Sequence, residues 1–203
     1  DRADDSNLRF PAGTQLIRDI IGGEGTNNPF NKVVNIGFID NNANAEFMEP
    51  SNTSFNSSTG EYDVRINLDD LHVTEAWSYE SNSIEEMETP MFLVVGHELI
   101  HAMNYITGAV DNWNMKYTGV NVVVRPGGEV EYYQERLEEI RTIGRSYYDQ
   151  KEFNNFSDPS MPLELKEGAV LKSYDVLYSE NILRAEHFLG ERYYHEADNK
   201  IER

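Results

Sequence analysis

Hydrophobic and polar residues follow the pattern of β-strands in two segments of the N-terminal third of the chain. Residues 61–73 alternate apolar and polar side chains, and residues 31–40 are rich in β-branched and aromatic residues. We expect both segments to form strands that pair with each other. The stretch between them, residues 49–60, is rich in Ser, Asn and Thr and predicts an exposed loop. A short helix is predicted before the first strand, over residues 8–23.

Three later segments have helical spacing. The first is PMFLVVGHELIHAMNYITG (residues 90–108). We expect the Thr89 hydroxyl to cap this helix, Pro90 to be its first residue and Gly108 to end it. The second covers residues 128–148, where apolar side chains recur every three or four positions. The third covers residues 173–198 and predicts one or two helices. Between the first two, residues 120–126 (VNVVVRP) predict a strand or a connector.

Length and composition are those of one globular domain. The chain has 203 residues, 39% of them apolar, and contains no internal repeat and no linker-like segment. We therefore expect a single domain of the α+β class over residues 1–203, with a small N-terminal β-sheet and a flexible start at residues 1–10. No apolar stretch reaches the length of a membrane span, and no classical signal peptide is recognised, so we expect no membrane partner.

Charge and cysteine content narrow the possible chemistry. A formal net charge of −19 argues against nucleic-acid binding, which requires Lys and Arg patches that neutralise phosphates. It favours basic proteins or peptides as partners, although acidic residues also simply keep a surface soluble. The chain has no cysteine, so disulfides and thiolate metal ligands are excluded. Any transition-metal site must use His, Asp and Glu, and we expect a monomer.

Residues 97–101, in the first predicted helix, spell H-E-L-I-H. The four-residue spacing puts His97 and His101 on one face, a turn apart, where both imidazoles can bind one ion. Two imidazoles and one further ligand hold tetrahedral Zn²⁺ and leave the fourth position for water. Glu98 is offset around the helix, where its carboxylate can take a proton from that water. The motif predicts a zincin-like zinc peptidase site rather than two histidines with packing roles.

The third zinc ligand must come from outside this helix. A third histidine at the metzincin spacing would fall at Thr107, and a glutamate at the thermolysin spacing would fall at Asn121, so neither pattern fits. Candidates are the glutamates of the segment that follows, and helical spacing does not choose among them. They are Glu129, Glu131, Glu135, Glu138 and Glu139.

The stretches HELIHAMNYITG and LEEIRTIG resemble the clostridial neurotoxin light chains. In that family HELIH is followed by an E-E-x-R-T-x-G segment whose second glutamate binds zinc. The resemblance implies that Glu139 is the third ligand and that Glu138 supports the ligand shell. The same pair of motifs is similar to the NleD-type effector metallopeptidases, small bacterial zinc proteases delivered into host cells. The resemblance covers roughly residues 90–195.

The resemblance extends to SENILRAEHFLGERYY (residues 179–194). In the neurotoxin light chains a glutamate precedes a substrate-polarising arginine by twelve residues, as Glu180 precedes Arg192 here. The resemblance implies that Glu180 orients an imidazole or Arg192, and that Arg192 and a tyrosine donate to the developing oxyanion. We expect this tyrosine to be Tyr194.

The chain departs from the family pattern at the position of that tyrosine. The neurotoxins carry it three residues after the arginine, where this chain has His195. Tyr194 is one residue short, so His195 and Tyr193 remain alternatives. Arg184 is a second cationic candidate.

We expect a zinc metalloendopeptidase that acts as a translocated bacterial effector or toxin domain and cleaves a host protein. It would be secreted or translocated into the host-cell cytoplasm, and a chain without disulfides suits passage through a secretion channel. One alternative is a non-catalytic zincin-like binding module with a structural metal, closed by His187 or His195 as fourth ligand. Another is a peptidase that acts on bacterial proteins.

Overall fold

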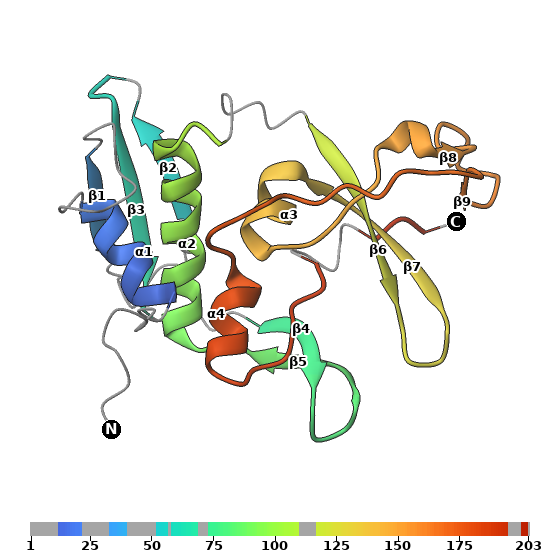
Figure 1. Ribbon diagram of the computed structural model, residues 1–203, viewed down its shortest axis with the longest axis horizontal. Coiled ribbons are helices and arrows are strands. Elements are labelled where there is room, and N and C mark those ends of the chain that lie inside the picture. Colours follow the sequence, from blue (N-terminus) through green and yellow to red (C-terminus); the bar gives the residue numbers. More distant parts are fainter. Residues whose placement is uncertain are drawn as a thin grey trace, which may run out of the picture.

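The computed structural model describes residues 12–21, 33–39, 52–56, 58–68, 73–109, 117–194 and 200–202. These residues form a mixed α and β structure (Figure 1). Their α-helices are α1 (Ala12–Ile21), α2 (Met91–Ile106), α3 (Leu137–Ile143) and α4 (Glu180–Glu186). Their strands are β1 (Val34–Ile39), β2 (Asn52–Asn56), β3 (Glu61–Asn67), β4 (Val73–Ser78), β5 (Ser83–Glu88), β6 (Thr118–Val124), β7 (Val130–Arg136), β8 (Phe153–Asn154) and β9 (Glu164–Leu165). The predicted flexible start, residues 1–10, lies outside the described residues.

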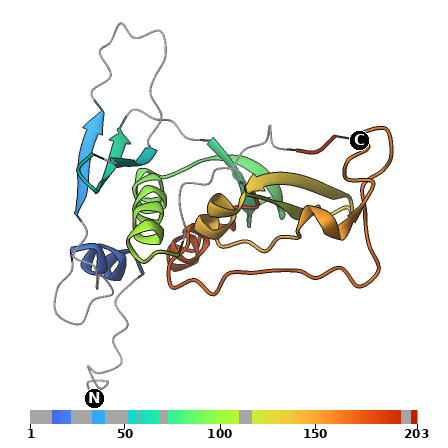
Figure 2. The same ribbon diagram turned by 90° about the horizontal axis from the view of Figure 1, so that it is seen from above.

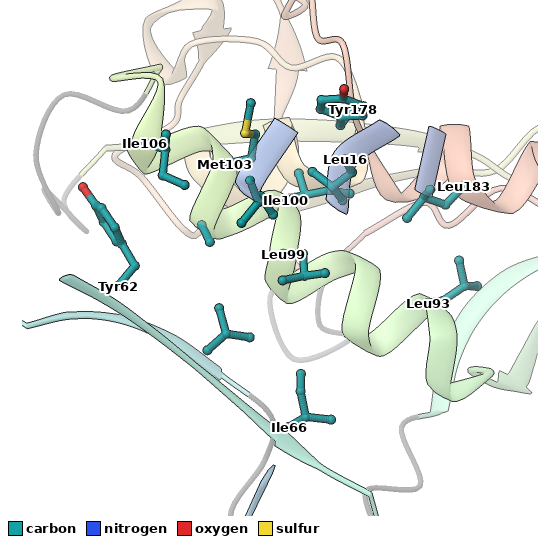
Figure 3. Close-up of a cluster of buried hydrophobic side chains, with 13 residues drawn as sticks. Leu16, Tyr62, Ile66, Leu93, Leu99, Ile100, Met103, Ile106, Tyr178 and Leu183 are labelled. Carbon is teal, nitrogen blue, oxygen red and sulfur yellow. The ribbon is translucent and has the colours of Figure 1, made fainter. Parts of the chain in front are cut away.

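Helix α2 lies between the N-terminal β-sheet on one side and helices α3 and α4 on the other (Figures 1 and 2). On one side lies a sheet of strand order β1-β3-β2, in which β1 is parallel and β2 antiparallel to β3. The alternating side chains Tyr62, Val64 and Ile66 of β3 are buried in a cluster with residues of α1 and α2 (Figure 3). The predicted pairing of the two strands is therefore confirmed, and the predicted first helix is confirmed over Ala12–Ile21. The ends of that helix prediction, residues 8–11 and 22–23, and residues 69–72 of the second strand prediction lie outside the described residues.

Strand β2 lies where an exposed loop was predicted. That prediction was wrong for Asn52–Asn56, which pair with β3 so that Thr53 lies opposite Val64. The Ser- and Asn-rich composition is typical of turns, but backbone pairing with a neighbouring strand can override local preference. Pairing of this kind leaves no signal in the segment itself.

The helix predicted over residues 90–108 is confirmed as α2. The predicted cap was wrong, because Pro90 occupies the N-cap position and the Thr89 hydroxyl lies 2.9 Å from the Thr74 hydroxyl of β4 instead. Gly108 follows the helix with a φ of 67°, a left-handed conformation that glycine adopts without strain. No helix in the described part of the chain has the length and apolar character needed to cross a bilayer.

Residues 128–148 contain a strand and a short helix instead of the single helix predicted. β6 and β7 form an antiparallel hairpin, and α3 begins only at Leu137. Of the strand or connector predicted for residues 120–126, the strand is confirmed as far as Val124. The helix prediction over residues 130–136 was wrong. Apolar residues three or four positions apart are typical of a helix, but they also occur in a strand that has both faces partly buried. The sequence Arg125-Pro-Gly-Gly128, which forms the hairpin turn, was the signal that argued for two strands.

Within the described part of residues 173–198, only α4 is an α-helix. The Ser179 hydroxyl caps it by accepting a hydrogen bond of 3.2 Å from the Ile182 amide. Phe188, with a φ of 56°, turns the chain away from the helix, and Arg192 then forms a β-bridge with Ala76 of β4. The helical prediction is confirmed for α4 and wrong for the extended residues on either side of it.

A charged network ties the C-terminal residues to the β6–β7 hairpin. The Glu131 carboxylate accepts hydrogen bonds from Arg125 Nε at 2.6 Å, from the Tyr133 hydroxyl at 2.9 Å and from Lys200 Nζ at 2.6 Å. Burial raises the pKa of Glu131, but the hydrogen bonds from Lys200 and Arg125 outweigh it and lower the pKa to about 2. The network keeps Glu131 ionised and fixes Lys200 against β7.

Replacing Glu131 with Gln is expected to remove a pH-dependent part of the stability. The pKa of Glu131 in the folded protein lies below its ordinary value of 4.5, so its contribution is complete above about pH 4.5 and is lost as the pH falls through about 2. Wild type should therefore be more stable than Glu131→Gln at neutral pH, with a difference that shrinks between pH 4.5 and pH 2. Denaturant titrations at several pH values measure it, and a constant difference would contradict the assignment.

Candidate metal centre

The side chains of His97 and His101 converge on one side of α2. They are one turn apart, and their Nε2 atoms lie 2.9 Å from each other, with the two rings at an interplanar angle of 79°. Each residue is only 7% exposed. The two nitrogens thus point at the same small volume, as two ligands of one ion must.

Glu139 brings a carboxylate to the same point from the first turn of α3. Its Oε2 lies 3.4 Å from His97 Nε2 and 3.3 Å from His101 Nε2. A tetrahedral zinc site with bonds of about 2.0–2.1 Å has ligand atoms about 3.3 Å apart. Glu139 Oε2 and the two Nε2 atoms form a triangle. Its two edges from Glu139 match that spacing, and its third edge, between the two imidazole nitrogens, is somewhat shorter. Three donors of the types that zinc prefers therefore fit one ion.

Helices α2 and α3 are joined beside these ligands. Asn104, one turn after His101, donates to the Thr142 hydroxyl at 3.1 Å and accepts from Arg141 Nε at 3.1 Å. These hydrogen bonds hold α3 in register with α2. The position of Glu139 is therefore set by both helices.

The other nitrogen of each imidazole is bound by a carboxylate. His97 Nδ1 lies 2.9 Å from Glu180 Oε2, and His101 Nδ1 is hydrogen-bonded to Glu138 Oε1. The Thr142 hydroxyl lies 3.3 Å from the same nitrogen of His101. A carboxylate at Nδ1 keeps the proton on that nitrogen and leaves the Nε2 lone pair free for a metal.

Glu180 lies in a buried network with two arginines. Its Oε1 accepts from Arg184 Nε and its Oε2 from Arg192 Nη1, both at 2.7 Å. Burial raises the pKa of Glu180, but Arg192, His97 and Arg184 outweigh it and hold the pKa well below its ordinary value. Gly96 leaves room for Leu183 of α4, because a Cβ there would lie 2.5 Å from Leu183 Cδ1 and the leucine side chain would have to shift.

The carboxylates also act on the protonation of the two imidazoles. Burial and the neighbouring His101 lower the pKa of His97, but Glu139 and Glu180 more than offset them and the net pKa is raised. Burial lowers the pKa of His101, whereas Glu139 and Glu138 outweigh it and raise the pKa well above its ordinary value. The site therefore attracts positive charge, whether protons or a metal cation.

Glu98 is positioned by a contact that sequence reasoning missed. The residue is 8% exposed, and its Oε2 accepts a hydrogen bond of 2.8 Å from the Thr53 hydroxyl of β2. One ligand atom from each of Glu98, His97 and His101 lies within 4.8 Å of the others. Thr53 belongs to the segment predicted as a loop, so no local signal marked it.

Two of the five candidate glutamates have a described contact with the imidazoles. Glu138 and Glu139 do so from α3. Glu131 is bound in the Arg125 and Lys200 network on β7. Of the other predicted residues, His187 packs its ring against Phe92, with centroids 4.4 Å apart, and belongs to neither group of possible metal ligands among the described residues.

The predicted oxyanion donors lie in different surroundings. Arg192 reaches the site through Glu180 and donates Nε to the Tyr194 carbonyl oxygen at 3.0 Å. The Tyr194 ring stacks on Tyr133 of β7, with centroids 4.0 Å apart, and is buried in a cluster with Val123.

Tyr193 and His195 are the alternatives to Tyr194. The Arg145 guanidinium lies over the Tyr193 ring, 4.8 Å from the ring centroid. His195 lies outside the described residues, so its alternative role stays a prediction.

The chain matches no protein-family model, and neither the curated proteins nor the solved structures contain a match to it.

Proposed function

We propose that this protein is a zinc-dependent endopeptidase whose ligands are His97, His101 and Glu139. The observation that carries the proposal is the triangle of two imidazole nitrogens and one carboxylate oxygen, with edges of 2.9, 3.3 and 3.4 Å. Its edges approximate those of a tetrahedral zinc site. The carboxylates at both Nδ1 atoms add support, because they are the usual partners of zinc-bound imidazoles.

In the proposed mechanism Glu98 is the general base. Zn²⁺, when bound, supplies positive charge that polarises the peptide carbonyl and makes water easier to deprotonate. Glu98 accepts the proton of the attacking water and passes it to the amine that leaves when the C–N bond breaks. The hydrogen bond from Thr53 restrains the Glu98 carboxylate, so that its position does not depend on the substrate.

The residues around the ligands have supporting roles in this mechanism. Glu138 and Glu180 hold the imidazoles in the orientation and tautomer that zinc needs. Arg184 and Arg192 keep Glu180 ionised and fixed. Donation by Arg192 and Tyr194 to the oxyanion stays a prediction from the resemblance.

We further propose that the substrate is a host protein and that the chain acts as an effector or toxin delivered into host cells. The support is the pairing of HELIH with EEIRTIG, the absence of cysteine and the net charge of −19, which suits a basic substrate segment. A peptidase with bacterial substrates would show the same site, so the choice between them rests on the sequence resemblance.

Profiling of protein N-termini tests both the activity and its target. A host-cell lysate and a bacterial lysate are each treated with wild type, with Glu98→Gln, and with wild type in the presence of a chelator. We expect new N-termini in the host lysate with wild type alone. New termini in the bacterial lysate only would reject the host substrate, and their absence from both would argue against a peptidase.

A further inference from the structure

The chain that follows α4 is held between strand β4 and the first turn of α4. Arg192 forms an antiparallel bridge with Ala76 of β4, and the Trp77 amide donates to the Glu191 carbonyl oxygen at 2.9 Å. Gly190 allows this close approach, because a Cβ there would lie 1.5 Å from the Trp77 carbonyl oxygen. In an extended chain the main-chain polar groups of successive residues point to opposite sides. The N–H and C=O groups of Arg192 therefore point away from β4.

Asn181 binds both of these main-chain groups. Its Oδ1 accepts a hydrogen bond of 2.8 Å from the Arg192 amide, and its Nδ2 donates one of 3.0 Å to the Arg192 carbonyl oxygen. One carboxamide thus makes the pair of hydrogen bonds that a residue of a neighbouring antiparallel strand would make. Asn181 lies in the first turn of α4, directly after Glu180. The main chain of Arg192 is therefore fixed to the turn that carries Glu180.

The side chain of Arg192 returns to the same turn of α4. Its Nη1 donates to Glu180 Oε2 at 2.7 Å, and its Nε donates to the Tyr194 carbonyl oxygen at 3.0 Å. The residue is only 2% exposed. Glu180 Oε2 is also the atom that lies 2.9 Å from His97 Nδ1. Arg192 and His97 therefore share one carboxylate oxygen, and a shift of the guanidinium would disturb the group that orients the imidazole.

The contacts of the Arg192 side chain depend on where its main chain lies. A guanidinium carries its N–H donors in a rigid planar fork, and a hydrogen bond weakens steeply when its donor turns away from the acceptor. The two hydrogen bonds from Asn181 restrain the main chain from which this fork extends. Such support matters at a metal site, because a displacement of about 1 Å in the residues behind the ligands is enough to impair it.

We propose that Asn181 is a positioning residue of the metal centre. Its carboxamide fixes the main chain of Arg192, so that the guanidinium holds Glu180 in the position that orients His97. The inference rests on the proposed function in that His97 is taken to be a zinc ligand.

Asn181→Ala tests the inference, since it removes both hydrogen bonds and leaves every charged group of the network in place. We expect the affinity for zinc, measured by competition with a chromophoric chelator, to fall about tenfold, as for other residues that support zinc ligands. Ser179→Ala is the matched control, because it removes the hydroxyl that caps the same helix and leaves the Asn181 carboxamide intact. Its zinc affinity should stay within about twofold of wild type. Wild-type affinity in Asn181→Ala, or an equal loss in Ser179→Ala, would overturn the proposal.

A double-mutant cycle with Arg192→Met separates positioning from general support of the fold. If Asn181 acts through the guanidinium, Asn181→Ala should change the zinc affinity less than about twofold once Arg192→Met is present. A role in fold stability alone would lower the affinity by the same factor in both backgrounds, and that result would overturn the proposal.

Hydrogen exchange gives a readout that needs neither zinc nor turnover. The Arg192 Nε–H, which donates to the Tyr194 carbonyl oxygen, should exchange at least about tenfold faster in metal-free Asn181→Ala than in metal-free wild type. Equal exchange rates would overturn the proposal, even if Arg192→Met does not fold. If wild type binds no zinc, the proposed function itself fails, and the exchange rates still decide whether Asn181 positions Arg192.

Discussion

Glu98→Gln is expected to lower the rate of peptide cleavage by about 10³-fold while the protein keeps its zinc. Glutamine has the shape of glutamate but cannot accept the proton of the attacking water. The amide oxygen can still accept the hydrogen bond from Thr53, so the fold around the side chain should be preserved. The three proposed ligand atoms belong to His97, His101 and Glu139, and none is changed by this substitution. Steady-state kinetics together with metal analysis of the same sample measure both quantities.

The matched control is Glu85→Gln, which removes one carboxylate from an exposed position on β5. It should have wild-type activity, and so shows whether loss of one negative charge matters in itself. Full cleavage by zinc-loaded Glu98→Gln would remove Glu98 from the mechanism. Loss of zinc together with activity would instead make Glu98 a ligand.

Glu139→Ala is expected to weaken zinc binding by more than about 10²-fold. Changes in residues that only support zinc ligands cost about 10–100-fold in affinity, and loss of a ligand should exceed this. Glu138 is hydrogen-bonded to His101 Nδ1 and is proposed to support that imidazole, so Glu138→Ala should fall within the smaller range. Competition with a chromophoric chelator gives the affinities.

Glu129→Ala provides the control for the two substitutions. Glu129 came from the same set of sequence candidates, but it lies exposed in the turn before β7. The Glu129→Ala variant should bind zinc with the affinity of wild type. Equal affinities for Glu139→Ala and Glu129→Ala would mean that the carboxylate nearest both imidazoles is not a ligand.

Part of the site could be predicted because it depends on neighbours in sequence. His97 and His101 share a helix, and a spacing of four residues alone brings their rings to one side of it. Glu138 and Glu139 are also adjacent, and the resemblance singled them out from five glutamates. The structure brings both to the imidazoles, although they lie on a short helix that follows a strand and not within one long helix.

The remaining contacts depend on packing between distant segments. Thr53 reaches Glu98 across 45 positions of sequence, and Glu180 links Arg184 and Arg192 to His97. The pairing of β2 with β3 that positions Thr53 is a backbone interaction, which a composition rich in Ser and Asn does not reveal.

X-ray absorption at the zinc edge gives the number and type of the zinc ligands. For wild type loaded with one zinc per chain, we expect two imidazole ligands, with oxygen atoms for the rest of the coordination. Glu139→Ala, loaded at high protein concentration, should keep both imidazoles and change only its oxygen ligands. A wild-type spectrum that requires three or more imidazoles, or a chain that binds no zinc at all, would contradict the proposed zinc site.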